Sequence, residues 1–249
     1  METFHDSAWS EEDFSRKYLE RADIYIVERK KMFRLVASFY AHFFEGKKGI
    51  SLLDLGCGDG VLTEEILKTD ETIRGTLVDG SETMLQKARE RLQPYPCLSF
   101  VEASFHALLQ GEVNLPEFDF CFSSQAIHHL AMRDKASIFR YVYAHLKAEG
   151  CFVNIDVVLA PSDEVREWYY AIWKNWMHDM FERLSIEDEI PEDIITRYEN
   201  PSSMNKPDTL EAQLEALREA GFKDADCYYK NGIFAVFGGR KIQGQKYGS

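Results

Sequence analysis

The sequence predicts a doubly wound α/β sheet that closes with an antiparallel hairpin. Short apolar runs alternate with amphipathic helical patterns from residue 50 onward, and this alternation implies parallel βαβ units with right-handed crossovers. Three glycines, Gly56, Gly58 and Gly60, follow the first apolar run, where the chain must turn tightly or let a ligand approach its backbone. Asn231 and Gly232 separate the last two apolar runs and predict a two-residue hairpin turn.

The length and composition are typical of a folded globular protein and argue against a nucleic-acid-binding or membrane-spanning protein. The chain has 249 residues with 45% hydrophobic content, so one large domain or a domain with a cap is expected. Its 29 Lys and Arg against 42 Asp and Glu give a net charge of −13, which opposes general binding to a phosphate backbone. No apolar run approaches the roughly 18 residues that are needed to span a bilayer.

The N-terminus and the cysteines indicate a cytoplasmic protein. The first residues lack the basic start and the apolar stretch of a secretory signal. Five cysteines are scattered without a CxxC pair, which favours free thiols over disulfides or a structural zinc site. These cysteines are Cys57, Cys97, Cys121, Cys151 and Cys227.

The predicted elements follow from hydrophobic periodicity. Residues 10–45 have helical spacing, with Ser10 and Asp13 as a capping box. In the alternating part, Ser81 is the expected N-cap of one helix and Gly150 is expected to end another. The expected strands cover 50–55, 75–79, 98–103, 118–124 and 151–159, and the expected helices cover 61–68, 81–92 and 134–150.

The segment 161–206 interrupts this alternation. It begins at a proline, carries a helix dense in aromatic residues and continues as an acidic stretch, so we expect a helical insertion after the fifth strand. An amphipathic helix at 209–221 and the hairpin at 224–239 follow it. The expected single domain has an N-terminal helical cap (1–48), a cofactor-binding core (49–160), the insertion (161–206), and a final helix with the hairpin (207–241).

The glycine loop is expected to bind a ligand that contains a ribose. It follows a strand and opens a helix, where the backbone can approach a ligand and the helix N-terminus favours an anionic group. Asp79 ends the second strand 19 residues after Gly60, close to the distance of about 20 residues expected for an acid that binds a ribose. A dinucleotide and S-adenosylmethionine both fit these features.

The spacing of the glycines favours S-adenosylmethionine. The dinucleotide fingerprint is G-x-G-x-x-G, whereas this loop reads G-x-G-x-G and follows an acid, Asp54. A carboxylate is unfavourable beside a pyrophosphate but favourable near the ammonium group of a methionine moiety. The alternative for Asp54 is a strand-end residue that satisfies loop amides.

Three segments also resemble the motifs of class I S-adenosylmethionine-dependent methyltransferases. These segments are 52-LLDLGCGDG-60, 76-TLVDGSETML-85 and 118-FDFCFSSQAIHHL-130, and they match in order and spacing. The resemblance implies a Rossmann-like, seven-stranded mixed sheet and S-adenosyl-L-methionine as the cofactor. More narrowly, 25-YIVER-29, the aromatic insertion and 234-FAVFGGRK-241 resemble a group of microbial small-molecule methyltransferases.

The resemblance implies roles for the residues of the first two motifs. Gly56, Gly58 and Gly60 would wrap the methionine part of the cofactor, and Asp54 would support its amino end. Asp79 would bind both ribose hydroxyls, unless it is only a solvated acid at the end of a strand.

Other positions would bind the adenine. Gly80 would leave space for the cofactor, and Met84 would pack on the adenine face, although a Met in an amphipathic helix is more often core. Many members of the family carry an acid after the third strand, whereas this chain has Ala103, Ser104 and Phe105. Ser104 or backbone groups would therefore bind the adenine.

The methionine end would involve both the fourth strand and the N-terminal helices. Ser123 and Gln125 would lie against the methionine moiety beside the reacting methyl. Tyr25 and Arg29 lie four residues apart on one helical face and would close over the cofactor carboxylate. The alternative for Arg29 is an ordinary surface residue.

Methyl transfer from a sulfonium is an in-line displacement, so the protein must mainly align the acceptor and exclude water. A base helps only when the acceptor must lose a proton. His128, His129 and His178 are the candidates; His128 is either the base, a cofactor-binding residue or a structural residue.

The aromatic residues of the insertion have two interpretations. In the first, a lid over an apolar acceptor pocket is formed by Trp168, Tyr169, Trp173 and Trp176. In the second, Tyr169, Trp173 and Trp176 fall at helical spacing on one face and pack the helix onto the sheet.

We therefore predict a cytoplasmic methyltransferase, a monomer or homodimer, that acts on an unidentified small molecule without a metal, a membrane or a nucleic-acid partner. Methylation of RNA or protein and a non-catalytic cofactor-binding module are the alternatives; the missing third dinucleotide glycine opposes an oxidoreductase. One basic cluster keeps RNA possible: Arg133, Lys135, Arg140 and Lys147.

Overall fold

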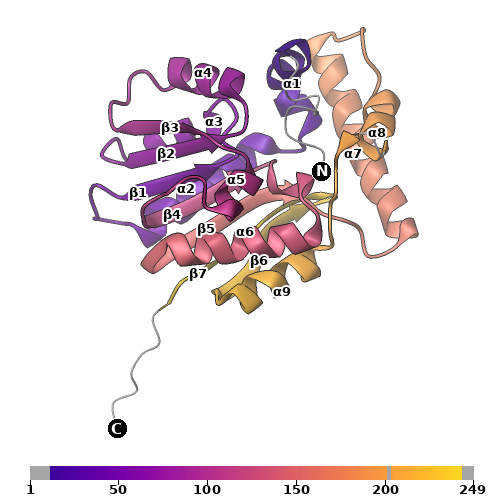
Figure 1. Ribbon diagram of the computed structural model, residues 1–249. Helices are drawn as coiled ribbons and strands as arrows, with labels where there is room; N and C mark the ends of the chain where they lie inside the picture. Colours follow the sequence, from indigo (N-terminus) through magenta and orange to yellow (C-terminus); the bar gives the residue numbers. More distant parts are fainter. Residues whose placement is uncertain (1–11, 201–202, 243–249) are drawn as a thin grey trace.

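A seven-stranded mixed sheet forms the centre of the molecule (Figure 1). The computed structural model describes residues 12–200 and 203–242. The strands are β1 (Ser51–Leu55), β2 (Arg74–Asp79), β3 (Leu98–Glu102), β4 (Phe118–Ser124), β5 (Leu146–Val157), β6 (Lys223–Asn231) and β7 (Phe234–Arg240). Their order is β3-β2-β1-β4-β5-β7-β6, with β7 antiparallel to both neighbours and the other pairs parallel. The predicted fold class is confirmed.

Helices cover both faces of the sheet (Figure 1). They are α1 (Glu12–Tyr25), α2 (Arg29–Phe43), α3 (Val61–Leu67), α4 (Glu82–Arg91), α5 (Phe105–Gln110), α6 (Met132–His145), α7 (Asp163–Leu184), α8 (Pro191–Glu199) and α9 (Leu210–Ala220), with a 3-10 helix, η3 (Ile127–His129). One buried cluster joins the sheet to α1, α2, α3, α4, α7 and α8, and a second joins it to α5, α6 and α9. Because side chains alternate along a strand, Leu52 belongs to the first cluster and Leu53 to the second.

The helical front of the chain consists of two helices. Residues 26–28 separate α1 from α2, and Glu28 has a φ of 52° immediately before α2 begins. Ile26 and Val27 are buried in this break, so the turn itself contributes to the core. Ser10 of the predicted capping box lies outside the described residues.

The boundary between α6 and β5 differs from the prediction. α6 ends at His145, and β5 begins at Leu146 instead of residue 151. Leu146 is fully buried and pairs with Phe118 of β4, so its side chain is part of the sheet core. Gly150 therefore does not end a helix. A Cβ atom there would lie 2.9 Å from the carbonyl oxygen of Lys147, so the glycine permits close packing within the strand.

The insertion after β5 packs onto α1 and the hairpin through its aromatic residues. The indole Nε1 of Trp173 donates to the carbonyl oxygen of Tyr25 at 2.7 Å, and that of Trp176 donates to the carbonyl oxygen of Ile24 at 3.0 Å. Trp173 also contacts Phe234 of β7, with ring centroids 5.6 Å apart. These contacts agree with the packing interpretation of the aromatic residues.

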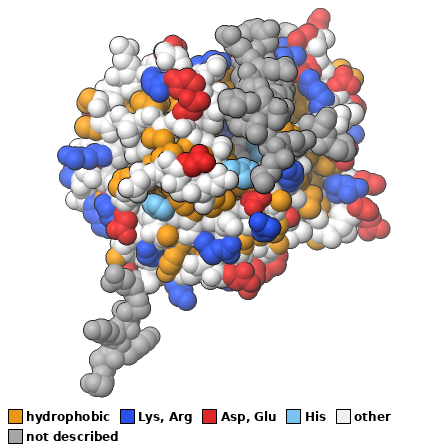
Figure 2. Space-filling model, in the orientation of Figure 1, with side chains coloured by type: hydrophobic (Ala, Val, Ile, Leu, Met, Phe, Trp, Pro, Cys, Tyr) orange, Lys and Arg blue, Asp and Glu red, His pale blue; other side chains and the backbone are white. Residues whose placement is uncertain are grey.

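Acidic and basic side chains are interspersed on the face that Figure 2 shows. Of the basic cluster named from the sequence, Arg133 and Arg140 are exposed, whereas the two lysines are engaged within the protein. Lys135 is fully buried, where its ammonium donates to the carbonyl oxygen of Lys206 and to the carboxylate of Asp208. Lys147 forms an ion pair with Asp119 at 2.8 Å. Among the helices that the structure describes, none is long and apolar enough to cross a bilayer.

We predict that Trp173→Phe lowers the free energy of unfolding by about 2 kcal/mol, because it removes packing volume and leaves the Tyr25 carbonyl without its indole donor. Trp168→Phe is the matched control, since Trp168 is 59% exposed on the same helix and such changes usually stay within about 0.5 kcal/mol. Urea unfolding measures both values. Equal effects of the two substitutions would contradict the anchoring role.

Candidate active site

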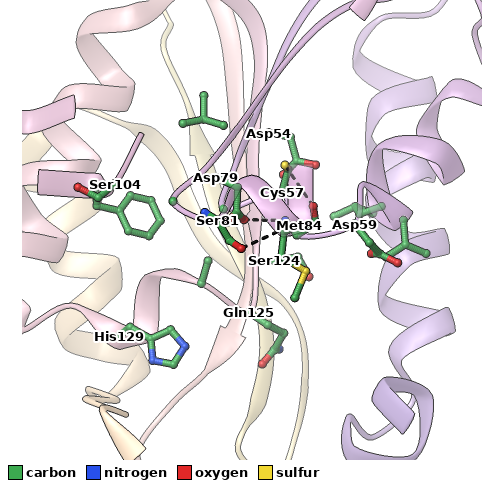
Figure 3. Close-up of a pocket in the computed structure, with 18 of the residues that line it drawn as sticks. Asp54, Cys57, Asp59, Asp79, Ser81, Met84, Ser104, Ser124, Gln125 and His129 are labelled. Atoms are coloured by element: carbon green, nitrogen blue, oxygen red, sulfur yellow. Dashed lines mark hydrogen bonds between the residues drawn. The ribbon is translucent and has the colours of Figure 1, made fainter. Parts of the chain in front are cut away.

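A cavity of about 220 Å³ lies at the carboxyl ends of β1, β2 and β4 (Figure 3). One buried water needs only about 15 Å³, so this space is large enough for a ligand. Its position agrees with the general rule that ligands of open α/β sheets bind beyond the carboxyl ends of the strands. The predicted site residues on its wall are Arg29, Asp54, Gly56, Gly58, Asp79, Gly80, Met84, Ala103, Ser104, Phe105 and Gln125.

The Asp79 carboxylate joins two loops of this wall. Its Oδ2 accepts a hydrogen bond from the amide of Gly58 at 2.8 Å, and its Oδ1 accepts one from the amide of Ser81 at 2.9 Å. Burial raises the pKa of Asp79, although the backbone hydrogen bonds oppose this shift. A carboxylate has about four lone-pair positions, so Asp79 keeps acceptor capacity for two ligand hydroxyls.

The three glycines of the loop have different roles. All have positive φ, but a Cβ on Gly56 would lie 2.4 Å from the Cβ of Ala126, and one on Gly60 would lie 2.8 Å from Leu92. These two glycines therefore permit close packing against the loop between β4 and η3 and against the end of α4. Gly58 has no atom within 4 Å of its Cβ position and lies on the cavity wall, so its backbone is open to a ligand.

Asp54 is buried at the end of β1 on the same wall. Its Oδ2 accepts a hydrogen bond from Thr63 Oγ1 of α3 at 2.6 Å. Burial raises its pKa to about 8, and the charges of Asp79 and Asp59 add to the shift. A cationic ligand group nearby would stabilise the ionised carboxylate. Asp54 thus bonds to a helix hydroxyl rather than to the loop amides considered in the sequence.

The expected adenine side of the wall comes from β3, α4 and α5. Met84 is 4% exposed and lies in the wall, so it is both buried and available to a ligand. The Ser104 Oγ accepts a hydrogen bond from the amide of Ala107 as the N-cap of α5, which leaves its hydroxyl proton for another partner. Ala103 and Phe105 lie on either side of this cap.

Gln125 and Arg29 supply polar groups to the cavity. Gln125 has a φ of 54°, which is rare for a residue with a side chain and is often found at functional sites. Its buried Nε2 has no hydrogen-bond partner among the described residues. Arg29 donates to Asp23 at 3.0 Å and lies over the Phe33 ring, while its buried Nε has no such partner in the described chain. Both side chains can donate to a ligand oxygen.

Four predicted residues do not lie on the described cavity wall. Gly60 packs against α4, and the Ser123 hydroxyl is buried, where it donates to the carbonyl oxygen of Leu55 at 2.7 Å. The Tyr25 hydroxyl donates to Glu189 of the insertion at 2.6 Å. The fourth residue is His128.

The two histidines of η3 face different surroundings. His128 is buried, and its Nδ1 lies 2.5 Å from Asp156 Oδ1 at the end of β5. His129 is the one on the cavity wall (Figure 3). Burial holds the pKa of His129 well below its ordinary value, so its imidazole is neutral. The predicted base is therefore held by a carboxylate, and its neighbour faces the cavity.

The cavity wall contains residues that the sequence did not suggest. Tyr18 and Leu19 come from α1, Phe33 comes from α2, and Met204 comes from the end of the insertion. No local motif marks these positions, because tertiary packing alone brings them to the sheet. Trp168, Tyr169, Trp173 and Trp176 are absent from the described wall. Asp59 and Ser124 are also on the wall and adjoin predicted residues.

The sequence is similar to a methyltransferase family and to known proteins. A family model described as a methyltransferase domain matches residues 52–150. A carboxy-S-adenosyl-L-methionine synthase of Nautilia profundicola is 20% identical over 75% of this chain and 75% of its own length. An uncharacterised methyltransferase of Schizosaccharomyces pombe is 36% identical over 49% of this chain and 45% of its own length.

Solved structures show the same fold. An O-methyltransferase family protein from Burkholderia thailandensis superposes with a TM-score of 0.67 at 12% identity, covering 97% of this chain and 64% of that one. Human N-acetylserotonin methyltransferase in complex with SAM gives a TM-score of 0.54 at 16% identity, covering 94% of this chain and 60% of that one. The chain therefore spans less than two thirds of the length of these two structures.

We predict that stability falls as pH rises from about 4 to 8 because of Asp54. The folded carboxyl keeps its proton up to pH about 8, whereas the unfolded one ionises near pH 4. Between these values the folded state binds more protons, so raising the pH favours unfolding. Asp54→Asn should flatten the pH dependence of the unfolding free energy in urea, and Asp179→Asn, at an exposed position on α7, should leave it unchanged. A wild-type slope in Asp54→Asn would contradict the assignment.

Proposed function

This chain is a class I S-adenosylmethionine-dependent methyltransferase, and we propose that its acceptor is a small molecule bound in the cavity beside Gln125. S-adenosyl-L-methionine is its cofactor. The acceptor is inferred from the cavity, since neither the motifs nor the fold names it.

The residues on the wall fit the cofactor. Gly58 offers an unobstructed backbone, and Asp79 keeps free acceptor positions for ribose hydroxyls. Asp54 would favour the ammonium group, and Arg29 and Gln125 would donate to the carboxylate or to other oxygens. When bound, the cofactor supplies an electrophilic methyl group on a sulfonium leaving group.

The observation that carries the acceptor proposal is the apolar remainder of the wall. Beyond the glycine loop and the ends of β2 and β3, the described wall includes Tyr18, Leu19, Phe33, Leu130 and Met204. Small-molecule sites are typically concave and mostly apolar, with a few polar groups that fix orientation. Arg29 is the one Lys or Arg on this wall within the described residues. A polynucleotide acceptor would need more positive charge near the site.

Catalysis would depend mainly on positioning. Tyr18 and Leu19 of α1 and Met204 line the cavity, so they help to exclude water, and the strained Gln125 backbone directs one polar side chain into it. His128 does not lie on the described wall, and the low pKa of His129 makes it a weak base. We therefore propose alignment of the acceptor, rather than general-base catalysis by either histidine, as the main contribution of the protein.

The acceptor class is tested by incubating the protein with methyl-labelled S-adenosylmethionine and separate small-molecule, RNA and protein fractions of a cell extract. Label should enter the small-molecule fraction only. Label in RNA or protein would overturn the proposal, and cofactor binding without any labelled product would support a non-catalytic binding module. Mass spectrometry of the cofactor is included because some relatives are named carboxy-S-adenosyl-L-methionine synthase; a carboxylated cofactor would show that reaction instead.

We predict that Gly58→Ala weakens binding of S-adenosylmethionine at least tenfold, because the new methyl group would point into the space beside the loop backbone. Gly46→Ala is the matched control. Gly46 also has a positive φ and no atom within 4 Å of its Cβ position, but it does not lie on the cavity wall. Both substitutions should cost about 1 kcal/mol of stability through backbone strain. Calorimetric titration that gives equal affinities for the two variants would contradict the role of Gly58.

A further inference from the structure

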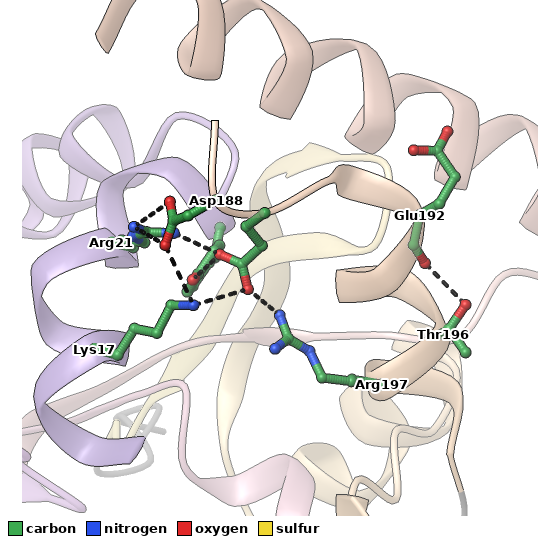
Figure 4. A network of polar contacts seen from close by, with 8 residues as sticks. Lys17, Arg21, Asp188, Glu192, Thr196 and Arg197 are labelled. Carbon is green, nitrogen blue, oxygen red and sulfur yellow. Dashed lines mark hydrogen bonds and ion pairs between the residues drawn. The ribbon is translucent and has the colours of Figure 1, made fainter. Parts of the chain in front are cut away.

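The buried carboxylate of Glu189 connects the insertion to α1. Glu189 lies between α7 and α8, and its side chain is 4% exposed. Its Oε2 accepts hydrogen bonds from Arg21 Nη1 at 2.9 Å and from the Tyr25 hydroxyl at 2.6 Å. Lys17 Nζ lies 3.6 Å from Oε1, and Arg197 of α8 donates to the same oxygen. Three α1 residues and one α8 residue thus converge on one carboxylate. Figure 4 shows three of them, Lys17, Arg21 and Arg197.

The donors around Glu189 stabilise its negative charge. Burial would raise the pKa of Glu189, but the hydrogen bonds from Tyr25, Arg197 and Arg21 lower it to about 2. Charge-assisted hydrogen bonds of this kind are stronger than neutral ones, and the low exposure of Glu189 limits screening by salt. Asp188, the adjacent residue, also accepts two hydrogen bonds from Arg21, but its side chain is 60% exposed. Exposed ion pairs contribute little.

α1 is also part of the cavity wall. Tyr18 and Leu19 line the cavity, while Lys17 and Arg21 on the same helix reach Glu189. The end of α1 is held by a second set of contacts, the indole hydrogen bonds to the carbonyl oxygens of Ile24 and Tyr25. The insertion therefore contributes to the cavity indirectly, because it holds a helix that lines it.

We propose that Glu189 is a positioning residue that clamps α1 over the cavity, and that this cluster must open when a ligand leaves. The proposal rests on the proposed function in that the cofactor and the acceptor share this cavity. It gives the insertion a role that does not require its aromatic residues to contact the acceptor. It also assigns the closing contact to charged residues, whereas the aromatic contacts anchor the end of the helix.

The test is the dissociation rate of S-adenosylhomocysteine, the demethylated product, followed by stopped-flow tryptophan fluorescence. Trp173 and Trp176 are suitable reporters because their indole groups bond to α1. Glu189→Gln removes the charge at nearly constant size and should speed dissociation about tenfold. Asp188→Asn is the matched control and should change the rate less than twofold, since Asp188 is exposed.

A second variant tests the clamp while Glu189 keeps its charge and a cationic partner. Arg21→Gln removes an α1 partner but leaves Glu189 paired with Arg197, so no buried charge loses all its partners. It should also speed dissociation, and the double variant with Glu189→Gln should be no faster than the faster single variant. Far-UV circular dichroism confirms that each variant is folded.

The possible results distinguish failure of the clamp from failure of the proposed function. If the wild-type protein does not bind S-adenosylhomocysteine, both the cofactor assignment and the clamp are overturned. If the wild type binds but Glu189→Gln dissociates within twofold of the wild-type rate, the clamp alone is overturned. Equal acceleration in Asp188→Asn would also overturn it, because a general effect of surface charge would then explain the result.

Discussion

The hydrogen bond from the Gly58 amide to the Asp79 carboxylate is the constraint on which the site depends. It holds the loop after β1 against the end of β2, and the amides of Gly56 and Cys57 reinforce it by donating to the carbonyl oxygen of Val78. The same loop packs against Ala126 beyond β4, at a distance that only a glycine allows. Three neighbouring strand ends are therefore fixed relative to one another, and the cavity is the space that this arrangement leaves.

Two buried carboxylates differ in whether the protein itself stabilises their negative charge. Asp54 has one neutral donor, Thr63, and burial raises its pKa to about 8. Glu189 is surrounded by cationic side chains and its pKa is lowered to about 2. A buried charge is tolerated when it is paired, and otherwise the group takes up a proton. Glu189 is thus already satisfied by the protein, whereas Asp54 would gain from a cationic ligand.

Features that depend on the spacing of neighbouring residues could be predicted from the sequence. The glycine loop, Asp79 and the hairpin were predicted because each is determined by a few neighbouring residues, and the structure places Gly58 and Asp79 on one wall. Ser124 and His129 line the cavity, whereas their neighbours Ser123 and His128 do not lie on the described wall, so the motifs located these two segments but not the side chains that face the cavity. Neighbouring residues of a strand or a 3-10 turn point in different directions, so a small error in register changes which side chain is available.

Contacts between distant segments were not predictable in the same way. Tyr25 and Glu189 are separated by 164 residues, and no pattern in either segment indicates that they meet. The predicted boundary between α6 and β5 was wrong for a related reason. The buried pairing of Leu146 with Phe118 overrides a helical pattern that continues to Gly150. Periodicity identifies an amphipathic segment, but the partner that covers it decides where the segment ends.

The charge of the cavity wall has a consequence for turnover. Asp59 is paired with Arg91, and Arg29 is paired with Asp23, whereas Asp54 and Asp79 have no Lys or Arg partner in the described chain. Such a wall favours a ligand that carries positive charge. Because transfer of the methyl group from a sulfonium removes one positive charge, the same carboxylates attract the product less than the cofactor. Electrostatics then favours product release, while the clamp on α1 sets how fast the cavity can open.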